Sequence, residues 1–213
     1  MSTTSPGGLT RASQSGSVAS DKARLRTQVR AARAADGQRA EADLARLPRL
    51  LAACAGHEVV ACYFSVAPEP DTVALVGALS DAGVRVLLPV LKGHREPAWN
   101  WYPGPGSLVE GWRGIPEPAG TPLGSAALRA CSFVWVSALQ VTPGGYRLGT
   151  GGGWDDRALT HADPDAVRGT LVGDPEVVDA VPREPWDLPV DLVVTPTRTI
   201  VTGARGVRVP PGE

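Results

Sequence analysis

The stretch EVVACYFSVAPEPDTVALVGALSDAGVRVLLPVL, residues 58–91, decides the fold. Its two ends, 58–66 and 84–91, are nearly continuous runs of apolar, β-branched and aromatic residues, as expected for strands buried on both faces. The middle, 71–82, spaces its apolar residues as an amphipathic helix does, with polar capping residues before it and a glycine after it. A strand, a helix and a second strand in this order form a βαβ unit, which predicts a parallel sheet.

Further elements extend this unit in both directions along the chain. Good helix formers dominate residues 20–55, which predicts one or two helices, limited or kinked at Pro48. Additional strands are predicted at 99–102, 133–141, 170–172 and 192–195. Residues 103–124 are rich in proline and glycine and are expected to form an extended surface connection. The predicted fold is α/β, a single-domain three-layer sandwich with a mostly parallel, mixed sheet and an N-terminal helical segment.

The domain boundaries follow from composition. Residues 1–19 contain mainly Ser, Thr and Gly with few large apolar groups, which predicts a disordered tail. The α/β domain is expected to cover 20–205, and 206–213 to form a C-terminal tail. A chain of 213 residues is long enough for one substantial core.

Charge and cysteine content exclude several classes of protein. The formal net charge is -1, with 21 basic and 22 acidic residues, so no global field attracts nucleic acid or an anionic membrane. No apolar run is long enough for a membrane span or a signal-peptide core, which predicts a cytoplasmic protein. The three cysteines are scattered and odd in number, which favours reduced buried thiols. A monomer is expected.

A glycine run carries the functional signal. Six of the ten residues 144–153 are glycine, so backbone N–H groups there can approach an anion without interference from side chains. Arg147 and Arg157 add positive charge, and Asp155 and Asp156 are candidate metal ligands. A Walker A ending and a G-x-G-x-x-G fingerprint are both absent. A flexible linker and a sugar-phosphate loop are the alternatives. Because the run follows a predicted strand and precedes a short helix near Trp154, it lies where open α/β sheets bind ligands.

Five blocks of sequence, taken together, resemble the 5-formyltetrahydrofolate cyclo-ligase family, also called methenyltetrahydrofolate synthetase. GYRLGTGGGWDD, residues 145–156, is similar to the family signature G-Y/N-R-L-G-x-G-x-G-Y-Y-D. KARLR at 22–26 is similar to K-x-x-L-R, and SVAPEPDT at 65–72 to S-x-x-x-E-x-x-T. GIPEP at 114–118 and PREPWD at 182–187, followed by Val190-Asp191, resemble two further family blocks. The blocks occur in the family's order over about residues 20–200.

The resemblance implies an ATP-dependent ligase of one-carbon metabolism. In the implied reaction, ATP phosphorylates the N5-formyl oxygen of 5-formyltetrahydrofolate. N10 then attacks and closes the ring, and loss of phosphate leaves 5,10-methenyltetrahydrofolate and ADP. Phosphoryl transfer of this kind needs mainly positioning and charge neutralisation. Mg²⁺ is implied as cofactor, and the partners are small molecules, a reduced folate and ATP.

The resemblance also assigns site residues. Arg147 and Asp156 are implied as catalytic, and Asp156 and Asp187 as ligands of Mg²⁺. The implied ATP site consists of Lys22, Ala23, Arg24, Leu25, Arg26, Arg147, Leu148, Gly149, Thr150, Gly151, Gly152, Gly153, Trp154 and Asp155. The implied folate site consists of Phe64, Glu69, Thr150, Gly151, Gly152, Gly153 and Trp154. Within these sets, Glu69 would fix the polar edge of the folate, and Trp154 would offer it an aromatic face.

The chain departs from the family pattern at the glycine run. Trp154-Asp155 stands in place of two tyrosines, Ser137-Ala138 in place of a Pro-Gly pair, and Thr142 in place of an aspartate. An extra carboxylate at position 155 would act as a further metal ligand or would repel a nucleotide. The sequence therefore leaves open a folate- or nucleotide-binding paralogue with weak or lost catalysis, and an α/β enzyme of sugar-phosphate type.

Overall fold

A seven-stranded mixed sheet forms the centre of the protein in a computed structural model that describes residues 10–206, with side chains from residue 17 onward. The strand order is β11-β10-β9-β6-β1-β2-β3. The strands are β1 (Val59–Ala61), β2 (Arg85–Val90), β3 (Ala98–Trp101), β6 (Phe133–Val136), β9 (Val167–Leu171), β10 (Leu192–Val194) and β11 (Thr199–Val201). The five inner strands are parallel, and the edge strands β3 and β11 are antiparallel to their neighbours. The predicted mostly parallel, mixed sheet is confirmed.

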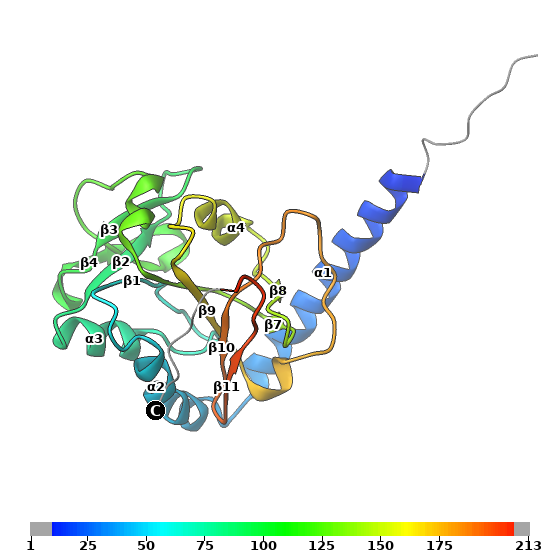
Figure 1. The fold of residues 1–213 in the computed structure, drawn as a ribbon, viewed down its shortest axis with the longest axis horizontal. Coiled ribbons are helices and arrows are strands. Elements are labelled where there is room, and N and C mark those ends of the chain that lie inside the picture. Colours follow the sequence, from blue (N-terminus) through cyan, green and yellow to red (C-terminus); the bar gives the residue numbers. More distant parts are fainter. Residues whose placement is uncertain (1–9, 207–213) are drawn as a thin grey trace, which may run out of the picture.

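The helices and two small hairpins surround this sheet (Figure 1). The α-helices are α1 (Thr10–Ala35), α2 (Arg39–Ala53), α3 (Val73–Asp81) and α4 (Trp154–Leu159). Short 3-10 helices are η1 (Pro105–Ser107), η2 (Trp112–Gly114), η3 (Ser125–Ala130) and η4 (Asp174–Glu176). The hairpins pair β4 (Leu108–Glu110) with β5 (Pro116–Pro118), and β7 (Gln140–Val141) with β8 (Arg147–Leu148). Within the described residues, no helix combines the length and apolar character that a bilayer span requires.

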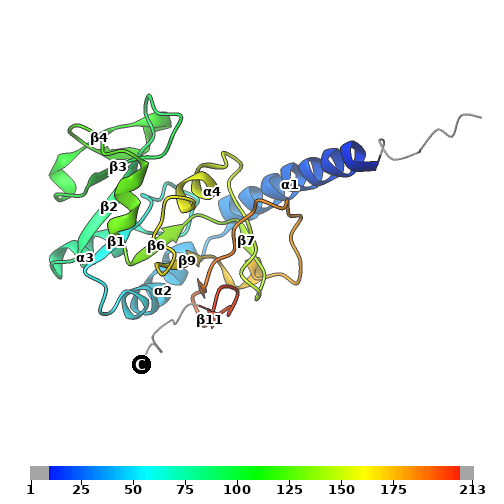
Figure 2. The same ribbon diagram turned by 45° about the horizontal axis from the view of Figure 1, so that its top comes forward.

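Alternate strand residues build two cores, one on each face of the sheet. Val60 and Cys62 belong to a cluster with apolar residues of α2 and α3, whereas Ala61 belongs to a cluster with residues of η3 and α4. This alternation is the period of two that a strand imposes on its side chains. The predicted three-layer sandwich is therefore confirmed, with α2 and α3 in one outer layer and α4 and η3 in the other (Figures 1 and 2).

The predicted βαβ unit is confirmed, but its first strand is shorter than expected. β1 ends at Ala61, and residues 62–66 leave the sheet as a loop. The predicted strand 133–141 likewise divides into β6 and β7, with Ser137 to Leu139 between them. In both segments the backbone carbonyls accept hydrogen bonds from side chains. Thr72 donates to the carbonyl of Tyr63, and Arg33 donates to the carbonyl of Ala138. Both segments lie at the carboxyl ends of parallel strands.

The N-terminal expectations need two corrections. The helix α1 begins at Thr10, so a disordered tail over 1–19 is wrong for residues 10–19, and residues 1–9 lie outside the described part. Helix propagation costs little once a helix is anchored, and Lys22 to Arg33 of α1 are anchored by packing and ion pairs. There are two helices in this region, and the break falls at residues 36–38 while Pro48 lies inside α2.

Residues 103–124 are more ordered than a surface connection. They contain the β4–β5 hairpin, and Glu117 is buried beneath it, where it accepts hydrogen bonds from the backbone N–H groups of Trp112 (2.9 Å) and Lys92 (3.2 Å). A Cβ on Gly111 would lie 2.1 Å from the Glu117 side chain, so the glycine makes room for the carboxylate. The glutamate of the GIPEP block thus holds this hairpin together.

Candidate active site

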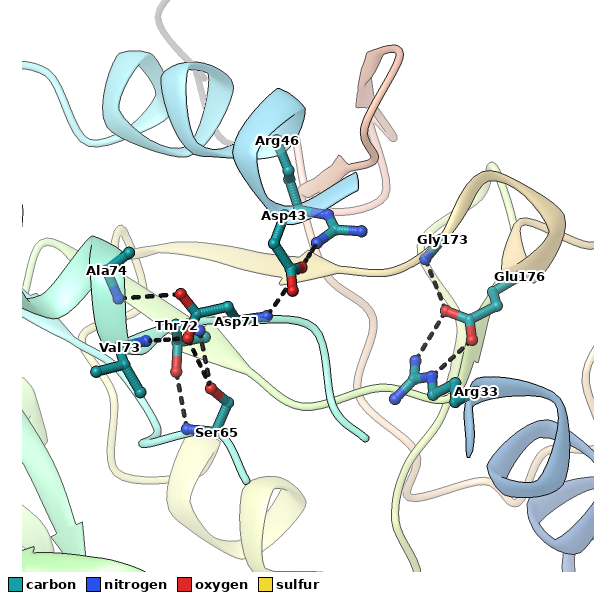
Figure 3. A network of polar contacts seen from close by, with 10 residues as sticks. All are labelled: Arg33, Asp43, Arg46, Ser65, Asp71, Thr72, Val73, Ala74, Gly173 and Glu176. Carbon is teal, nitrogen blue, oxygen red and sulfur yellow. Dashed lines mark hydrogen bonds and ion pairs between the residues drawn. The ribbon is translucent and has the colours of Figure 1, made fainter. Parts of the chain in front are cut away.

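The carboxyl ends of the inner strands meet at one edge of the sheet, and α1 crosses them. Arg33 near the end of α1 donates to the carbonyl of Ala138, just after β6, and pairs with Glu176, just after β9 (2.6 Å). Glu176 also accepts from the N–H of Gly173 (2.7 Å; Figure 3). This edge is the place where open α/β sheets bind ligands.

One face of α1 presents a row of basic side chains to the glycine run. Lys22, Arg26, Arg30 and Arg33 are spaced three or four residues apart, which places them on one side of a helix. Arg26 donates through Nε to the carbonyl of Gly149 (2.9 Å), and Arg30 donates to the carbonyl of Thr150 (2.7 Å). Burial, and next the charge of Arg30, lower the pKa of Arg26. Arg26 and Arg30 therefore hold the glycine run by its carbonyl oxygens, while Lys22 pairs with Asp187 and Arg33 with Glu176.

The N–H groups of the glycine run remain available. Residues 149–153 link β8 to α4, and no backbone hydrogen bond among the described residues uses their N–H groups. Gly151 and Gly153 have positive φ angles of 112° and 61°, a conformation that other residues adopt only with strain. Gly151 to Gly153 are exposed. Free N–H groups beside basic side chains make an anion-binding segment.

Arg147 is buried and engaged at both ends of its guanidinium. One terminal nitrogen donates to the carbonyl of Leu188 (2.5 Å), and the other pairs with Asp156 in α4 (2.8 Å). Its side chain is 2% exposed, and its Nε has no hydrogen-bond partner. Arg147 thus joins the glycine run to both α4 and the segment that carries Asp187.

Asp187 lies against α1 through an ion pair with Lys22 (Nζ to Oδ2, 2.6 Å). The same oxygen of Asp187 accepts from the N–H of Glu184 (2.7 Å). Asp156 and Asp187 each retain one carboxylate oxygen without a hydrogen bond among the described residues. Among the described residues of the chain, no three or more His, Cys, Asp or Glu side chains form a group that could hold a metal ion. Such a donor set fits Mg²⁺, which takes one or two carboxylates and completes its shell with phosphate and water.

The loop of residues 65–72 lies at the end of β1 and is closed on itself. Ser65 and Thr72 exchange two hydrogen bonds of 2.9 Å, N–H to Oγ1 and N–H to Oγ, at its base (Figure 3). Within the loop, the N–H of Val66 donates to Glu69 Oε2 (3.1 Å), and the Ala67–Pro68 peptide is cis. The S-x-x-x-E-x-x-T spacing is therefore the spacing of a closed loop that presents one glutamate.

Glu69 and Asp155 are two carboxyl groups at this edge whose pKa values are raised by burial. Burial raises the pKa of Glu69, and the negative charge of Asp155 raises it further, while the N–H of Val66 lowers it. Burial also raises the pKa of Asp155, against the opposing effect of Arg147. Two carboxyl groups with raised pKa values, from the β1 loop and from α4, thus flank the same edge.

Asp155 contacts Ser137, so that two departures from the family pattern form one contact. Ser137 donates to Asp155 Oδ2 through its hydroxyl (2.6 Å) and through its N–H (3.2 Å). This contact ties the first turn of α4 to the end of β6. Asp155 is engaged there and makes no hydrogen bond to residues 149–153 within the described part of the chain.

Several predicted residues do not reach the anion-binding segment. Ala23 and Arg24 lie on the exposed side of α1, where Arg24 contacts only Asp21 and Gln28 of its own helix. The side chains of Leu25 and Leu148 pack in an apolar cluster under α1. Phe64 packs against the α2–α3 core, and Trp154 stacks edge-on with Trp99 at 4.8 Å in the opposite core. The indole of Trp154 is therefore a packing group in this structure.

Sequence reasoning overlooked Arg30, Arg33 and the partner of Asp155. The helical spacing of Arg26, Arg30 and Arg33 was a readable signal, because residues at i, i+4 and i+7 share a face. The Ser137–Asp155 contact had no such signal, since the two residues are brought together only by the fold.

Asp155→Asn is expected to make thermal stability less dependent on pH. Because the pKa of Asp155 is raised in the folded state, the folded protein binds more protons than the unfolded chain between the two pKa values. The free energy of unfolding therefore falls as pH rises through that window, from the unfolded pKa near 3.8 upward. Asparagine retains an oxygen that accepts from Ser137. The melting temperature of the variant relative to wild type should increase as pH rises from about 4 to about 7. Asp165→Asn, at an exposed carboxylate, is the control, and equal pH profiles for Asp155→Asn and wild type would contradict the raised pKa.

The fold and the site define a class of protein: an α/β enzyme-like domain whose sheet edge carries an anion-binding glycine run, a basic helix and flanking carboxyl groups. Comparison with known proteins narrows this class. The 5-formyltetrahydrofolate cyclo-ligase family matches residues 18–196. The chain belongs to this family.

Individual relatives agree with that assignment. The chain is 37% identical to the 5-formyltetrahydrofolate cyclo-ligase of Mycolicibacterium smegmatis over 147 residues, which cover 67% of this chain and 75% of the relative. It is 32% identical to the Escherichia coli K12 protein of the same name over 169 residues, 76% of this chain and 88% of the relative. The fold matches the NMR structure of Aquifex aeolicus 5,10-methenyltetrahydrofolate synthetase with a TM-score of 0.72, at 24% identity, over 85% of this chain and 92% of that one. A synthetase from Mycoplasma pneumoniae matches with a TM-score of 0.62, at 17% identity, over 83% of this chain and 99% of that one.

Proposed function

We propose that the protein converts 5-formyltetrahydrofolate and ATP to 5,10-methenyltetrahydrofolate, ADP and phosphate. The observation that carries this proposal is the meeting, at one sheet edge, of a segment suited to phosphate and a closed loop that presents Glu69. A reaction that activates a formyl oxygen by phosphorylation requires those two binding functions side by side. Family membership supplies the substrates.

The nucleotide is proposed to bind between α1 and the glycine run. Lys22 and Arg26 would neutralise phosphate charge, and the free N–H groups of residues 149–153 would donate to phosphate oxygens. Asp156 and Asp187 would hold Mg²⁺, which when bound shields phosphate charge during transfer. Arg147 holds Asp156 in place and keeps a positive charge beside the run.

The reduced folate is proposed to bind at the 65–72 loop. Glu69 has one carboxylate oxygen engaged by Val66 N–H, which leaves the other for the folate. Because burial raises the pKa of Glu69, this carboxyl is also able to carry a proton at a higher pH than a solvent-exposed one. A monomeric state and a cytoplasmic location remain predictions.

The test is a coupled measurement of product and ADP. Purified protein with Mg²⁺, ATP and 5-formyltetrahydrofolate should develop the near-ultraviolet absorbance of the methenyl product, with one ADP released per product. Omission of ATP, or its replacement by a non-hydrolysable analogue, is the control. Tight binding of 5-formyltetrahydrofolate by calorimetry without ADP release would instead identify a binding paralogue. Asp155 bears on that alternative as a charge that would repel a nucleotide, and in this structure it contacts Ser137.

A further inference from the structure

The 65–72 loop is internally closed, and a polar contact from α2 also reaches it from outside. Pro68 and Pro70 border a hollow between the loop and the helices α1 and α2. This hollow is lined by charged side chains, namely Arg33, Asp36, Arg39, Asp43, Arg46 and Glu176. Polar contacts at this side are therefore available to hold the loop in place.

One such contact joins α2 to the loop. The N–H of Asp71 donates to Asp43 Oδ1 of α2 (3.1 Å), and Asp43 is in turn paired with Arg46 one helical turn later (Figure 3). The side chain of Arg46 is only 3% exposed, Asp43 is its sole ion-pair partner among the described residues, and its Nε has no partner. A buried guanidinium holds its one carboxylate partner strongly, so Asp43 is a fixed acceptor.

Asp71 connects the Asp43 contact both to helix α3 and to Glu69. Its own carboxylate accepts from the N–H groups of Val73 (2.9 Å) and Ala74 (3.2 Å) and so caps α3. On the other side, only Pro70 separates Asp71 from Glu69, and the proline ring restricts the backbone between them. Displacement of the Asp71 N–H would therefore move Glu69.

We propose that Asp43 is a positioning residue for the reduced folate: fixed by Arg46, it holds Asp71 and thereby sets the place of Glu69. The proposal rests on the proposed function, in which Glu69 contacts the folate. It assigns Asp43 no contact with the nucleotide, because Lys22, Arg26 and the glycine run are held by other contacts. Loss of the Asp43 acceptor should thus affect the folate and leave ATP binding unchanged.

The experiment compares three variants. Asp43→Leu combined with Arg46→Met removes the acceptor and the buried cation together, so no charge is left unpaired. Asp43→Asn keeps an oxygen for Asp71 N–H. Glu41→Gln changes an exposed carboxylate of α2 that makes no hydrogen bond to other described residues, and is the matched control. The expected result is a rise of about tenfold in KM for 5-formyltetrahydrofolate in the double variant, with KM for ATP within about twofold of wild type. Asp43→Asn should retain most of the wild-type folate affinity.

Amide hydrogen exchange gives a readout that does not depend on activity. Residues 65–72 should exchange faster in the double variant than in wild type, while α1 and the glycine run remain unchanged. If the KM for folate is unaltered in an active enzyme, or if both KM values increase equally, the role of Asp43 is overturned and the proposed function stands. Absence of methenyl product from the wild type would overturn the proposed function, and the exchange result would still decide whether Asp43 holds the loop. If the double variant does not fold, Asp43→Ala is measured below its melting temperature with the same outcomes.

Discussion

Asp156→Asn is expected to lower turnover by about 10²- to 10³-fold in a protein that still folds, so that the loss of turnover exceeds the loss of stability. Asparagine keeps an oxygen that accepts from Arg147, so the contact between the glycine run and α4 survives. The variant loses the negative charge that is proposed to hold Mg²⁺, and with it the charge neutralisation that phosphoryl transfer needs. Rates of methenyl formation and melting curves measure the two effects separately.

The control for this variant is Asp165→Asn, which changes an exposed carboxylate beyond the end of α4. It should leave turnover unchanged. If Asp156→Asn retained wild-type turnover, Asp156 would have no part in catalysis. If the variant unfolded, the Arg147–Asp156 pair would be a structural requirement and the glycine run would depend on it for folding.

Gly145→Ala is expected to cause the largest loss of stability, about 3 kcal/mol, or about 10 °C in melting temperature. Gly145 has a φ angle of 85°, which carries a strain cost for any residue with a Cβ. An added Cβ would also lie 2.3 Å from the carbonyl oxygen of Val190, and 3.1 Å from the hydroxyl oxygen of Thr202. The Gly145 carbonyl accepts from Val190 N–H (2.9 Å), so relief of the clash would break this tie.

Gly149→Ala is the matched control, four residues later in the same run. A Cβ there meets nothing within 4 Å, and its φ angle is not positive. Thermal melts of the two variants should therefore differ by several degrees. Equal melting temperatures would mean that the approach of Gly145 to Val190 does not constrain the fold.

The sequence predicted the architecture better than it predicted the ends of the elements. Continuous apolar runs and helical spacing are local patterns, and they located β1, α3, β2 and the mixed sheet correctly. The strand candidates 58–66 and 133–141 were too long because their last residues are apolar enough for a strand, yet their carbonyls serve Thr72 and Arg33. These hydrogen bonds come from residues outside the strand itself, so the local sequence pattern of the strand does not predict them.

The candidate site shows the same division. The resemblance pointed to Lys22, Arg26, Glu69 and the glycine run, and the structure brings Arg26 to the glycine run and Lys22 to Asp187. It also indicated Trp154 as an aromatic platform; the ring is half-buried and packs edge-on against Trp99, and its role toward a ligand stays a prediction. Whether the site residues act as proposed stays a prediction until the variants are measured.

The pairing of Lys22 with Asp187 places the earliest and the latest residues of the candidate site in direct contact, 165 residues apart in the chain. A ribosome releases α1 first, but the basic side chain at its centre has no acidic partner until the last third of the chain has emerged. The βαβ unit can form in the meantime from neighbouring segments, since its contacts are local. Turnover is therefore expected only from a chain that includes Asp187. A polypeptide truncated before residue 187 would keep much of its sheet and lack a working site.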